Sequence, residues 1–491
     1  MPTREQADVV IIGGGVVGTA IARELAKYKL AVILLEEQPD LAMGTTKANS
    51  AILHAGFDAT VGSLKATLNV RGNELYRQMK DELDLEINMV GSLVVALDDE
   101  EMKTLSELQK RGRDNGVPGL EIFGRDQVLA MEPNLSTDIA GALYAPTGGI
   151  MLPFGVALAF AENASRNGVQ VRTECPVTGF VIENGAVVGV KTPEGVIAAK
   201  YVVNAAGTRA DAVSRLAGDD SFAIQPRKGE YILFDKSVGN LVKAAIFPTP
   251  TKLSKGILVS PTIHGNIFIG PNAFNLTDKD DVATTAPGMA EIIAGARRLL
   301  PGLPLASGIT QFAGLRAVAD SGDFVIRPSS ITPGLVHAAG IQSPGLSAAP
   351  AIGEKIVAIL GELGLPLLKK TNFIPGNPRH AVFSKMDMEA RHELVAQNPL
   401  YGKIICRCET ITEAEIVDAI QRPCGARTVD GVKRRTRAGM GRCQGGFCGP
   451  RVTAILAREL KIPLTAVRKD APESYLFYDK IPGNCEVKNN V

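Results

Sequence analysis

The sequence predicts an α/β fold, in which a Rossmann-like dinucleotide-binding domain carries an antiparallel β-sheet substrate domain and a small α-rich C-terminal domain follows. One observation is the run VVIIGGGVVG at 9–18, where β-branched residues end in glycines and lead into the helical pattern TAIARELAKY. Another is the alternation of apolar and polar residues, with many prolines and glycines, over 222–275. The third is four cysteines in two close pairs near the C-terminus, which favour metal ligation in a reducing compartment over disulfides.

A strand, a glycine turn and a helix in this order form a phosphate-binding cradle. Gly13 allows a tight turn, Gly15 lets the backbone approach a pyrophosphate, and Gly18 lets the helix pack on the strand. The next strand, AVILL, ends at Glu36, which lies 23 residues after Gly13, near the position where an acid binds ribose hydroxyls. Because strand, helix and acid agree, we favour a dinucleotide site over a turn that only joins strand to helix.

Length and composition are those of a globular chain of two or three domains, with 491 residues, 45% hydrophobic and 21% charged. The net charge is +1, but residues 401–491 carry 16 Lys and Arg against 10 Asp and Glu, so the rest of the chain is acidic. Such a basic end is typical of a solvated face or of a docking surface for an acidic partner. A nucleic-acid surface is the alternative, and we do not predict one.

The apolar N-terminal stretch is interrupted by glycines and lacks the basic start and the cleavage pattern of a signal peptide. It is also too short to span a bilayer. We therefore expect a cytoplasmic protein with no transmembrane segment, which contacts a membrane only through partners.

The remaining elements alternate between helical and extended patterns. Residues 44–57 are rich in small polar residues and predict a loop and a helix start near the bound phosphate. Asn184-Gly185 marks a hairpin turn in the strand pair at 169–192. Apolar periodicity predicts helices at 64–83, 100–115, 154–167 and 286–300, strands at 91–97, 201–207 and 335–340, and a helix-opening loop at 341–360.

These patterns predict three regions. Residues 1–364 form the oxidoreductase domain, 365–399 form a linker without a periodic element, and 400–491 form the C-terminal domain and tail. Within the first region, the nucleotide-binding parts are expected at about 1–90, 145–215 and 310–362, and the substrate domain mainly at 216–309.

Residues 1–362 resemble the FAD-dependent amine and hydroxy-acid oxidoreductases of the D-amino-acid oxidase and glycerol-3-phosphate dehydrogenase type. The C-terminal part, with CRC at 406–408 and RAGMGRCQGGFCGP, resembles bacterioferritin-associated-ferredoxin-like [2Fe-2S] domains. The fusion looks most like the large subunit of anaerobic glycerol-3-phosphate dehydrogenases. The stretch NSAILHAGFDATVGSLKA at 49–66 is also close to that of L-2-hydroxyglutarate dehydrogenases.

The resemblance implies FAD as cofactor. Val177 is expected to meet the adenine side through its backbone, with a plain core-strand position as the alternative. Ala206 and Gly207 are expected to close the nucleotide site. The residues expected to line the pyrophosphate and the ribityl chain are Thr45, Thr46, Asn49 and Ser50.

The loop after the last strand is expected to serve the flavin ring. By the resemblance, Gly340 and the run 343–347 bring a helix N-terminus toward the flavin pyrimidine ring, where its dipole stabilises the anionic reduced form. Gly345, Leu346 and Ser347 stand where glycerol-3-phosphate dehydrogenases usually have a G-G-K-x-T segment, and this loop is nearer to that of the hydroxyglutarate relatives.

Oxidation of a secondary alcohol needs a hydride acceptor, a base and a cation for the anionic end of the substrate. His54 lies at the family's position facing the flavin and is the candidate base, with a supporting role in the cofactor loop as the alternative. Arg316 corresponds to the arginine that binds phosphate or carboxylate, with an ion pair to Asp320 or Asp323 as the alternative.

Three residues of the predicted substrate sheet are further candidates for the pocket. Lys228 and Tyr231 are expected to face it from the segment PRKGEY. His264 could reach the same pocket or sit in a turn.

The cysteine pairs Cys406/Cys408 and Cys443/Cys448 are separated by 34 residues. Four thiolates in two pairs fit a [2Fe-2S] cluster, and the glycines around the second pair leave backbone N–H groups for the cluster sulfurs. Zinc is the rival, although the C-x-C and C-x4-C spacings are atypical of zinc ribbons.

The resemblance therefore implies an FAD-dependent dehydrogenase that acts on a CH–OH group. We expect it to oxidise sn-glycerol 3-phosphate to dihydroxyacetone phosphate and to pass electrons through the cluster to a second redox or flavoprotein subunit. L-2-hydroxyglutarate oxidation is the alternative, followed by an amine or opine substrate and by a non-catalytic electron-transfer subunit.

Overall fold

The computed structural model describes residues 5–250 and 256–478. Contacts divide the chain into two compact units, of which the first comprises the residues up to Glu37 together with Leu41–Arg379. The second comprises Gln38–Asp40 and the residues from His380 onward. The part of the predicted tail after residue 478 lies outside the described residues.

The first unit contains a sheet that is built on β1 (Glu5–Ile12). β1 pairs in parallel with β2 (Val32–Leu35) on one side and with β12 (Gly195–Asn204) on the other. β2 and β12 then pair, also in parallel, with β9 (Gln170–Arg172) and β20 (Leu335–Ala339), respectively. The antiparallel strands of this sheet are β10 (Gly179–Glu183), β11 (Ala186–Thr192) and β19 (Val325–Pro328).

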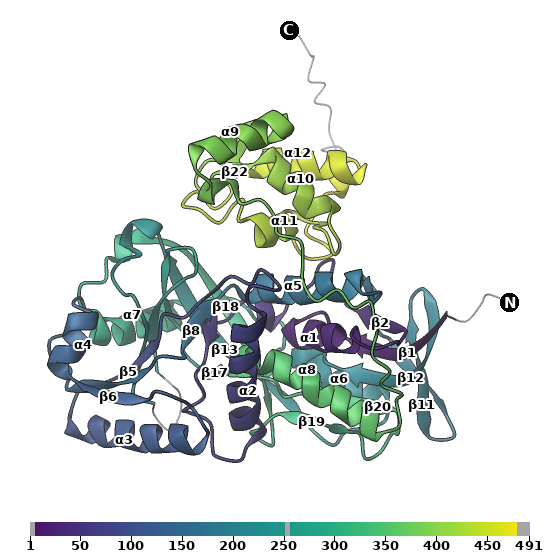
Figure 1. Cartoon of the computed structure of the whole chain (residues 1–491), viewed down its shortest axis with the longest axis horizontal. Coiled ribbons are helices and arrows are strands. Elements are labelled where there is room, and N and C mark those ends of the chain that lie inside the picture. Colours follow the sequence, from purple (N-terminus) through teal and green to yellow (C-terminus); the bar gives the residue numbers. More distant parts are fainter. Residues whose placement is uncertain (1–4, 251–255, 479–491) are drawn as a thin grey trace, which may run out of the picture. The chain divides into compact units, whose positions relative to one another are not determined.

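Three helices lie beside this sheet, as seen on the right of Figure 1. α1 (Val16–Leu25) packs against both α5 (Pro153–Arg166) and α8 (Gly345–Glu362). Every residue of α1 is buried, the charged pair Arg23 and Glu24 included. A helix that is covered on all sides has no solvent face, which explains why this segment is mostly apolar all round.

A second, mostly antiparallel sheet forms the other half of the first unit, on the left of Figure 1. β13 (Ile224–Phe234) pairs with β18 (Gly308–Ala319) along its whole length. β14 (Ala245–Pro248) pairs in parallel with β5 (Ser92–Ala96). The other strands are β6 (Glu121–Gly124), β7 (Gly141–Ala145), β15 (Leu258–Pro261), β16 (Ile267–Gly270) and β17 (Phe274–Asn275).

The antiparallel sheet predicted over 222–275 is confirmed, but it recruits more of the chain than the predicted substrate segment 216–309. β5, predicted as a strand at 91–97, joins it together with β6 and β7, which were not predicted, and β18 joins it from the predicted region 310–362. Alternation of apolar and polar residues predicts a strand but does not specify its partner, so the sequence could not assign these strands.

The remaining elements of the first unit lie around the two sheets. α2 (Leu64–Met79) packs against α8 and begins at Ser63, whose hydroxyl accepts the backbone N–H of Ala66. α4 (Arg125–Met131) was not predicted. The others are β3 (Ile52–Leu53), β4 (Ile87–Asn88), β8 (Gly149–Met151), α3 (Asp99–Asp114), α6 (Ala210–Leu216) and α7 (Ala286–Leu299).

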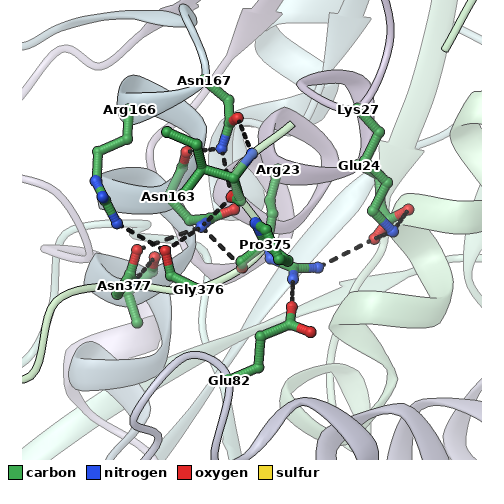
Figure 2. A network of polar contacts seen from close by, with 12 residues as sticks. Arg23, Glu24, Lys27, Glu82, Asn163, Arg166, Asn167, Pro375, Gly376 and Asn377 are labelled. Atoms are coloured by element: carbon green, nitrogen blue, oxygen red, sulfur yellow. Dashed lines mark hydrogen bonds and ion pairs between the residues drawn. The ribbon is translucent and has the colours of Figure 1, made fainter. Parts of the chain in front are cut away.

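Residues 365–379, here called the strap, belong to the first unit although they were predicted as part of a linker. Figure 2 shows how two buried asparagines, one in α5 and one directly after it, hold the strap: the amide of Asn163 donates to the carbonyl of Pro375 at 3.0 Å, and that of Asn167 donates to the carbonyl of Ile374 at 2.9 Å. Backbone polar groups of a segment without regular structure need such side-chain partners.

The second unit is α-rich, as predicted. α10 (Glu413–Gln421), α11 (Val429–Thr436) and α12 (Gly449–Leu460) enclose its core, which includes Cys406 and Cys448. The short strands β21 (Ile404–Cys406) and β22 (Ile411–Thr412) pair antiparallel.

α9 (Met388–Gln397) corrects the expectation that 365–399 holds no periodic element. Asp387 caps this helix by accepting the N–H of Ala390 at 2.9 Å. None of the ten residues of α9 is buried, so the helix has no apolar face and left no periodic signal in the sequence.

Within the described residues, no helix combines the length and the apolar character that crossing a membrane requires.

Candidate functional site

The predicted phosphate cradle forms between β1 and α1. Gly13 has a φ of +109°, and a Cβ there would lie 2.5 Å from the carbonyl oxygen of Ala205. A Cβ on Gly18 would lie 1.9 Å from the carbonyl oxygen of Gly13, so helix and strand are in backbone contact. A Cβ on Gly15 would meet only the hydroxyl of Thr46, at 3.3 Å. The cradle thus has the three glycine functions that the spacing predicts.

Glu36 and Thr46 both lie at this cradle. The carboxylate of Glu36, just after β2, accepts the N–H of Gly14 at 2.6 Å. The hydroxyl of Thr46 accepts the N–H of Val16, the first residue of α1, at 3.0 Å. These contacts place an acid and a hydroxyl beside the helix N-terminus, where backbone N–H groups favour an anion.

The loop that follows residue 44 is held by its own polar side chains. The hydroxyl of Thr45 donates to the carbonyl of Leu315 at 2.6 Å, and the amide of Asn49 donates to the carbonyl of Thr46 at 2.9 Å. Ser50 lies 3.3 Å from the hydroxyl of Tyr231, oxygen to oxygen. Thr45–Lys47 is a single turn of 3₁₀-helix, in agreement with the predicted loop and helix start.

The other predicted nucleotide contacts surround the carboxyl ends of the parallel strands. Val177 and Ala206 are both half-buried and pack against the apolar core beside β12. Gly207 has a φ of +56° and open space where a Cβ would be. Gly340, directly after β20, has a φ of +65°, and a Cβ there would lie 2.7 Å from Cβ of Ala319.

Gly345, Leu346 and Ser347 form the first turn of α8. The carbonyl of Leu346 accepts the hydroxyl of the buried Tyr76 at 2.9 Å. The hydroxyl of Ser347 accepts the backbone N–H of His54 at 2.8 Å. The start of this helix is therefore fixed to the segment that carries the candidate base.

A cavity of about 520 Å³ lies between the two halves of the first unit and is lined by both candidate catalytic residues, His54 and Arg316. Residues 342–344, directly before α8, also line it. Its size is that of a small-molecule site. The structure thus brings together two residues that are 262 positions apart in the sequence.

The imidazole of His54 is half-buried in this cavity. Its Nε2 lies 3.3 Å from the hydroxyl of Ser343, and its ring centroid lies 6.1 Å from that of Phe247. A serine hydroxyl can donate to a neutral imidazole and accept from a protonated one, so this partner serves both protonation states.

The guanidinium of Arg316 points into the same cavity. Its two terminal nitrogens lie 3.3 and 3.4 Å from the carbonyl oxygen of Asn272. Among the described residues no carboxylate pairs with it, because Asp323 instead accepts the backbone N–H groups of Leu64 and Lys65 at the start of α2. The ion pair considered as an alternative is therefore not formed.

None of the three further candidates from the sheet is among the residues that line the cavity, and His264 lies in a turn, which was its alternative. Lys228 is buried on the other face of β13, where it pairs with Asp281 at 2.8 Å, because consecutive strand residues point to opposite faces. Arg227, one residue earlier on the strand, lines the cavity instead. The sequence did not predict this, because the pattern does not show which face of the strand points to the cavity. Tyr231 reaches cavity-lining Ser50, and His264 pairs with Glu86 at 3.2 Å.

In the second unit the four predicted ligand cysteines gather as two pairs. The sulfurs of Cys408 and Cys443 lie 3.7 Å apart, and Cys406 and Cys448 share a hydrogen bond. Two thiolates for each of two irons is the arrangement that a [2Fe-2S] cluster requires.

Backbone N–H groups point at these sulfurs, as the glycine-rich sequence predicts. Cys406 receives them from Glu409 and Gly439, and Cys443 receives them from Gly445 and Phe447. Such donors stabilise the negative charge of a thiolate-bound cluster. The donor set therefore fits the group.

Two family models match the chain. The FAD dependent oxidoreductase model matches residues 8–359, and the BFD-like [2Fe-2S] binding domain model matches residues 404–458. Because the first match spans more than half of the chain, the protein belongs to the FAD-dependent oxidoreductase family. FAD and a [2Fe-2S] cluster are its cofactors.

Individual proteins of this family are similar to the chain over most of its length. The glycerol 3-phosphate dehydrogenase of Caloramator mitchellensis is 50% identical over 470 residues, which cover 96% of this chain and 98% of that protein. The FAD-bound, dithionite-reduced L-α-glycerophosphate oxidase of Mycoplasma pneumoniae has a TM-score of 0.73 at 30% identity and covers 77% of this chain and all of its own. The mitochondrial L-2-hydroxyglutarate dehydrogenase of Caenorhabditis elegans is 29% identical over 401 residues, 72% of this chain and 92% of that protein.

Proposed function

We propose that this protein oxidises sn-glycerol 3-phosphate to dihydroxyacetone phosphate and exports the electrons through its [2Fe-2S] cluster to a redox partner. The observation that carries the proposal is that His54 and Arg316 line the same cavity. Among the described residues, the guanidinium of Arg316 has no carboxylate partner. The identity to a glycerol 3-phosphate dehydrogenase over nearly the whole chain supports the substrate.

The residues that would hold FAD are those of the cradle. Gly13, Gly15 and Gly18 present no side chain between β1 and α1, and Glu36 and Thr46 contact the backbone of the same turn. Because glycine has no Cβ, a diphosphate can approach the main chain at these positions. FAD, when bound, accepts the hydride from the carbon that bears the oxidised hydroxyl.

His54 is the proposed base for the hydroxyl proton. The proton taken up at Nε2 is held by the hydroxyl of Ser343, which then acts as acceptor. The backbone of His54 is fixed by Ser347, so the ring keeps its place against the cavity. Arg316 binds the anionic end of the substrate with a planar fork of donors, which suits phosphate oxygens.

Electron export is supported by the second unit. A flavin receives two electrons at once, whereas a [2Fe-2S] cluster passes one at a time, so the cluster suits a dehydrogenase rather than an oxidase. The relative named as an oxidase covers 77% of this chain, whereas the dehydrogenase relative covers 96%. The partner is expected to be acidic, because residues 401–491 are basic, and its binding should weaken with salt.

L-2-hydroxyglutarate is the second candidate substrate. The family likeness to L-2-hydroxyglutarate dehydrogenases and the absence of the G-G-K-x-T segment from the sequence at 345–347 favour it. Both candidates are secondary alcohols with an anionic end, so the same base and cation would serve either.

The test is anaerobic mixing of the protein with each substrate while the flavin and cluster absorbances are followed. We expect glycerol 3-phosphate to bleach the flavin and then the cluster. Bleaching by L-2-hydroxyglutarate alone would replace the proposed substrate by the second candidate. Bleaching by neither would contradict both and favour an amine substrate or an electron-transfer subunit.

A further inference from the structure

Two arginines of the cavity lie directly opposite each other on neighbouring strands. Arg227 on β13 pairs with Arg316 on β18 in the antiparallel register, so both side chains leave the same face of the sheet. Both line the cavity. We propose that Arg227 is a second cationic arm of the substrate's anion site and that the two guanidiniums together select a phosphate dianion over a carboxylate. This inference rests on the proposed function.

The carboxylates of Asp58 and Asp323 line the same cavity, but within the described residues neither forms an ion pair with these two arginines. Like charges in directly opposed positions destabilise a sheet. Arg227 uses its Nε, which donates to the side-chain oxygen of Asn275 at 2.8 Å, and Arg316 contacts only the carbonyl of Asn272. Within the described ranges, neither has a carboxylate partner. An anion bound between them removes the repulsion, and a dianion does so more fully than a monoanion.

The orientation of Arg227 suits this role. Asn275, its direct partner on β17, takes the Nε–H and leaves the two terminal amino groups for a ligand. A phosphate monoester offers three peripheral oxygens, enough for a fork from each arginine, whereas a carboxylate offers two.

Arg316 is held in place from behind. The buried side chain of Asn272 accepts the N–H of Glu230 at 2.9 Å and donates to the Glu230 carboxylate at 3.1 Å. These contacts fix the backbone whose carbonyl receives Arg316. Gly229 completes the arrangement, since a Cβ there would lie 2.7 Å from a terminal nitrogen of Arg316. The position of this guanidinium is thus set by Asn272 and Gly229.

The experiment compares Arg227→Gln, Arg227→Lys and Arg316→Gln in the full-length holoenzyme, with Arg125→Gln on the exposed start of α4 as the matched control. For each protein the flavin absorbance, kcat and KM for glycerol 3-phosphate, and the inhibition constants of inorganic phosphate and of acetate are measured. Loss of one charge-assisted contact corresponds to roughly tenfold to hundredfold in affinity.

We expect Arg227→Gln to raise KM and the phosphate inhibition constant by the same factor, about tenfold or more, while kcat changes less than threefold and FAD stays bound. Arg227→Lys should fall between, because it keeps the charge and loses the fork. Calorimetry measures the affinity of the wild type for inorganic phosphate. This measurement tests the paired arginines even if glycerol 3-phosphate proves not to be the substrate.

Two outcomes would overturn the inference. In one, Arg227→Gln leaves KM and the phosphate constant unchanged while Arg316→Gln raises both, so that Arg316 binds the anion alone. In the other, Arg227→Gln weakens acetate and phosphate inhibition equally, so that the pair does not distinguish a carboxylate from a dianion. Neither outcome bears on the proposed function, which fails only if glycerol 3-phosphate does not reduce the wild-type flavin.

Discussion

The backbone N–H of His54 donates to the hydroxyl of Ser347 at 2.8 Å, and this bond joins the segment after β3 to the first turn of α8. The same hydroxyl lies 3.3 Å from the carbonyl of Ile52. Ser347 is fully buried, so both partners depend on it. The candidate base and the helix N-terminus expected at the flavin are thereby one rigid structure.

Replacement of His54 by Ala should slow substrate reduction of the flavin by about 10² to 10⁴, the usual contribution of a general base. Stopped-flow absorbance under anaerobic conditions measures this rate per bound FAD. His392→Ala on α9, in the second unit, is the control and should leave the rate unchanged. Loss of FAD with an unchanged rate per remaining flavin would identify His54 as a supporting residue instead.

Replacement of Ser347 by Ala should lower the free energy of unfolding by about 1 to 3 kcal/mol, because it leaves the N–H of His54 without its partner. Thermal unfolding of the holoprotein measures the loss. Ser106→Ala on the exposed face of α3 removes a solvent-exposed bond of 3.3 Å and should have little effect. Equal effects of the two changes would contradict the role given to Ser347.

Replacement of Cys408 by Ser should abolish the [2Fe-2S] cluster and leave FAD bound. Substrate should still bleach the flavin, whereas reduction of a one-electron acceptor through the cluster should be lost. Iron content and electron paramagnetic resonance of the reduced protein report the cluster. Cys424→Ser, outside both cysteine pairs, should keep it; a cluster that survives in Cys408→Ser would remove this residue from the ligand set.

Replacement of Asn163 by Ala should release the strap. Asn163 is fully buried, and its amide donates to the carbonyl of Pro375, so its loss removes a partly buried hydrogen bond worth about 0.5 to 1.5 kcal/mol. Limited proteolysis should then cut within 365–379. Arg166→Ala, which removes an exposed bond of 2.7 Å to Gly376, is the control, and both contacts can be followed in Figure 2. Unchanged resistance to protease in Asn163→Ala would contradict this account.

Acidification should destabilise the first unit through the buried pair of His337 and Asp219, whose side chains lie 3.0 Å apart. Burial lowers the pKa of His337 below its ordinary 6.5, even though Asp219 raises it. Below pH 6.5 the unfolded chain therefore binds a proton that the folded chain does not, and stability falls as the pH falls.

The pKa of Asp219 adds to this trend. Burial raises it, but hydrogen bonds from Ser221, Ser329 and His337 outweigh burial and lower it, so its contribution is present above its ordinary pKa of 3.8 and is lost below. His337→Asn should flatten the decline of the melting temperature between pH 6.5 and 4.5. An identical decline in wild type and variant would rule the histidine out.

The sequence by itself determined the parts whose chemistry is local. Gly13, Gly18 and Glu36 lie within one strand–turn–helix–strand unit, so their spacing alone predicts their contacts. The two sequence motifs that hold the cysteines are likewise short, since one residue separates Cys406 from Cys408 and four separate Cys443 from Cys448. Both features were predictable without knowledge of how distant segments meet.

Only the tertiary structure decided which residues share the cavity. Arg227 and Arg316 meet through strand pairing across 89 positions, and a strand pattern does not carry its partner or its register. In the same register Arg227 lines the cavity, whereas Lys228 lies on the opposite face of the strand and pairs with Asp281. The sequence did not predict the surface helix α9, because none of its residues is buried. It also did not predict that the strap packs on the first unit, because the strap is held by a side chain from a distant helix. Local spacing encodes the cofactor motifs, whereas long-range pairing positions the substrate site.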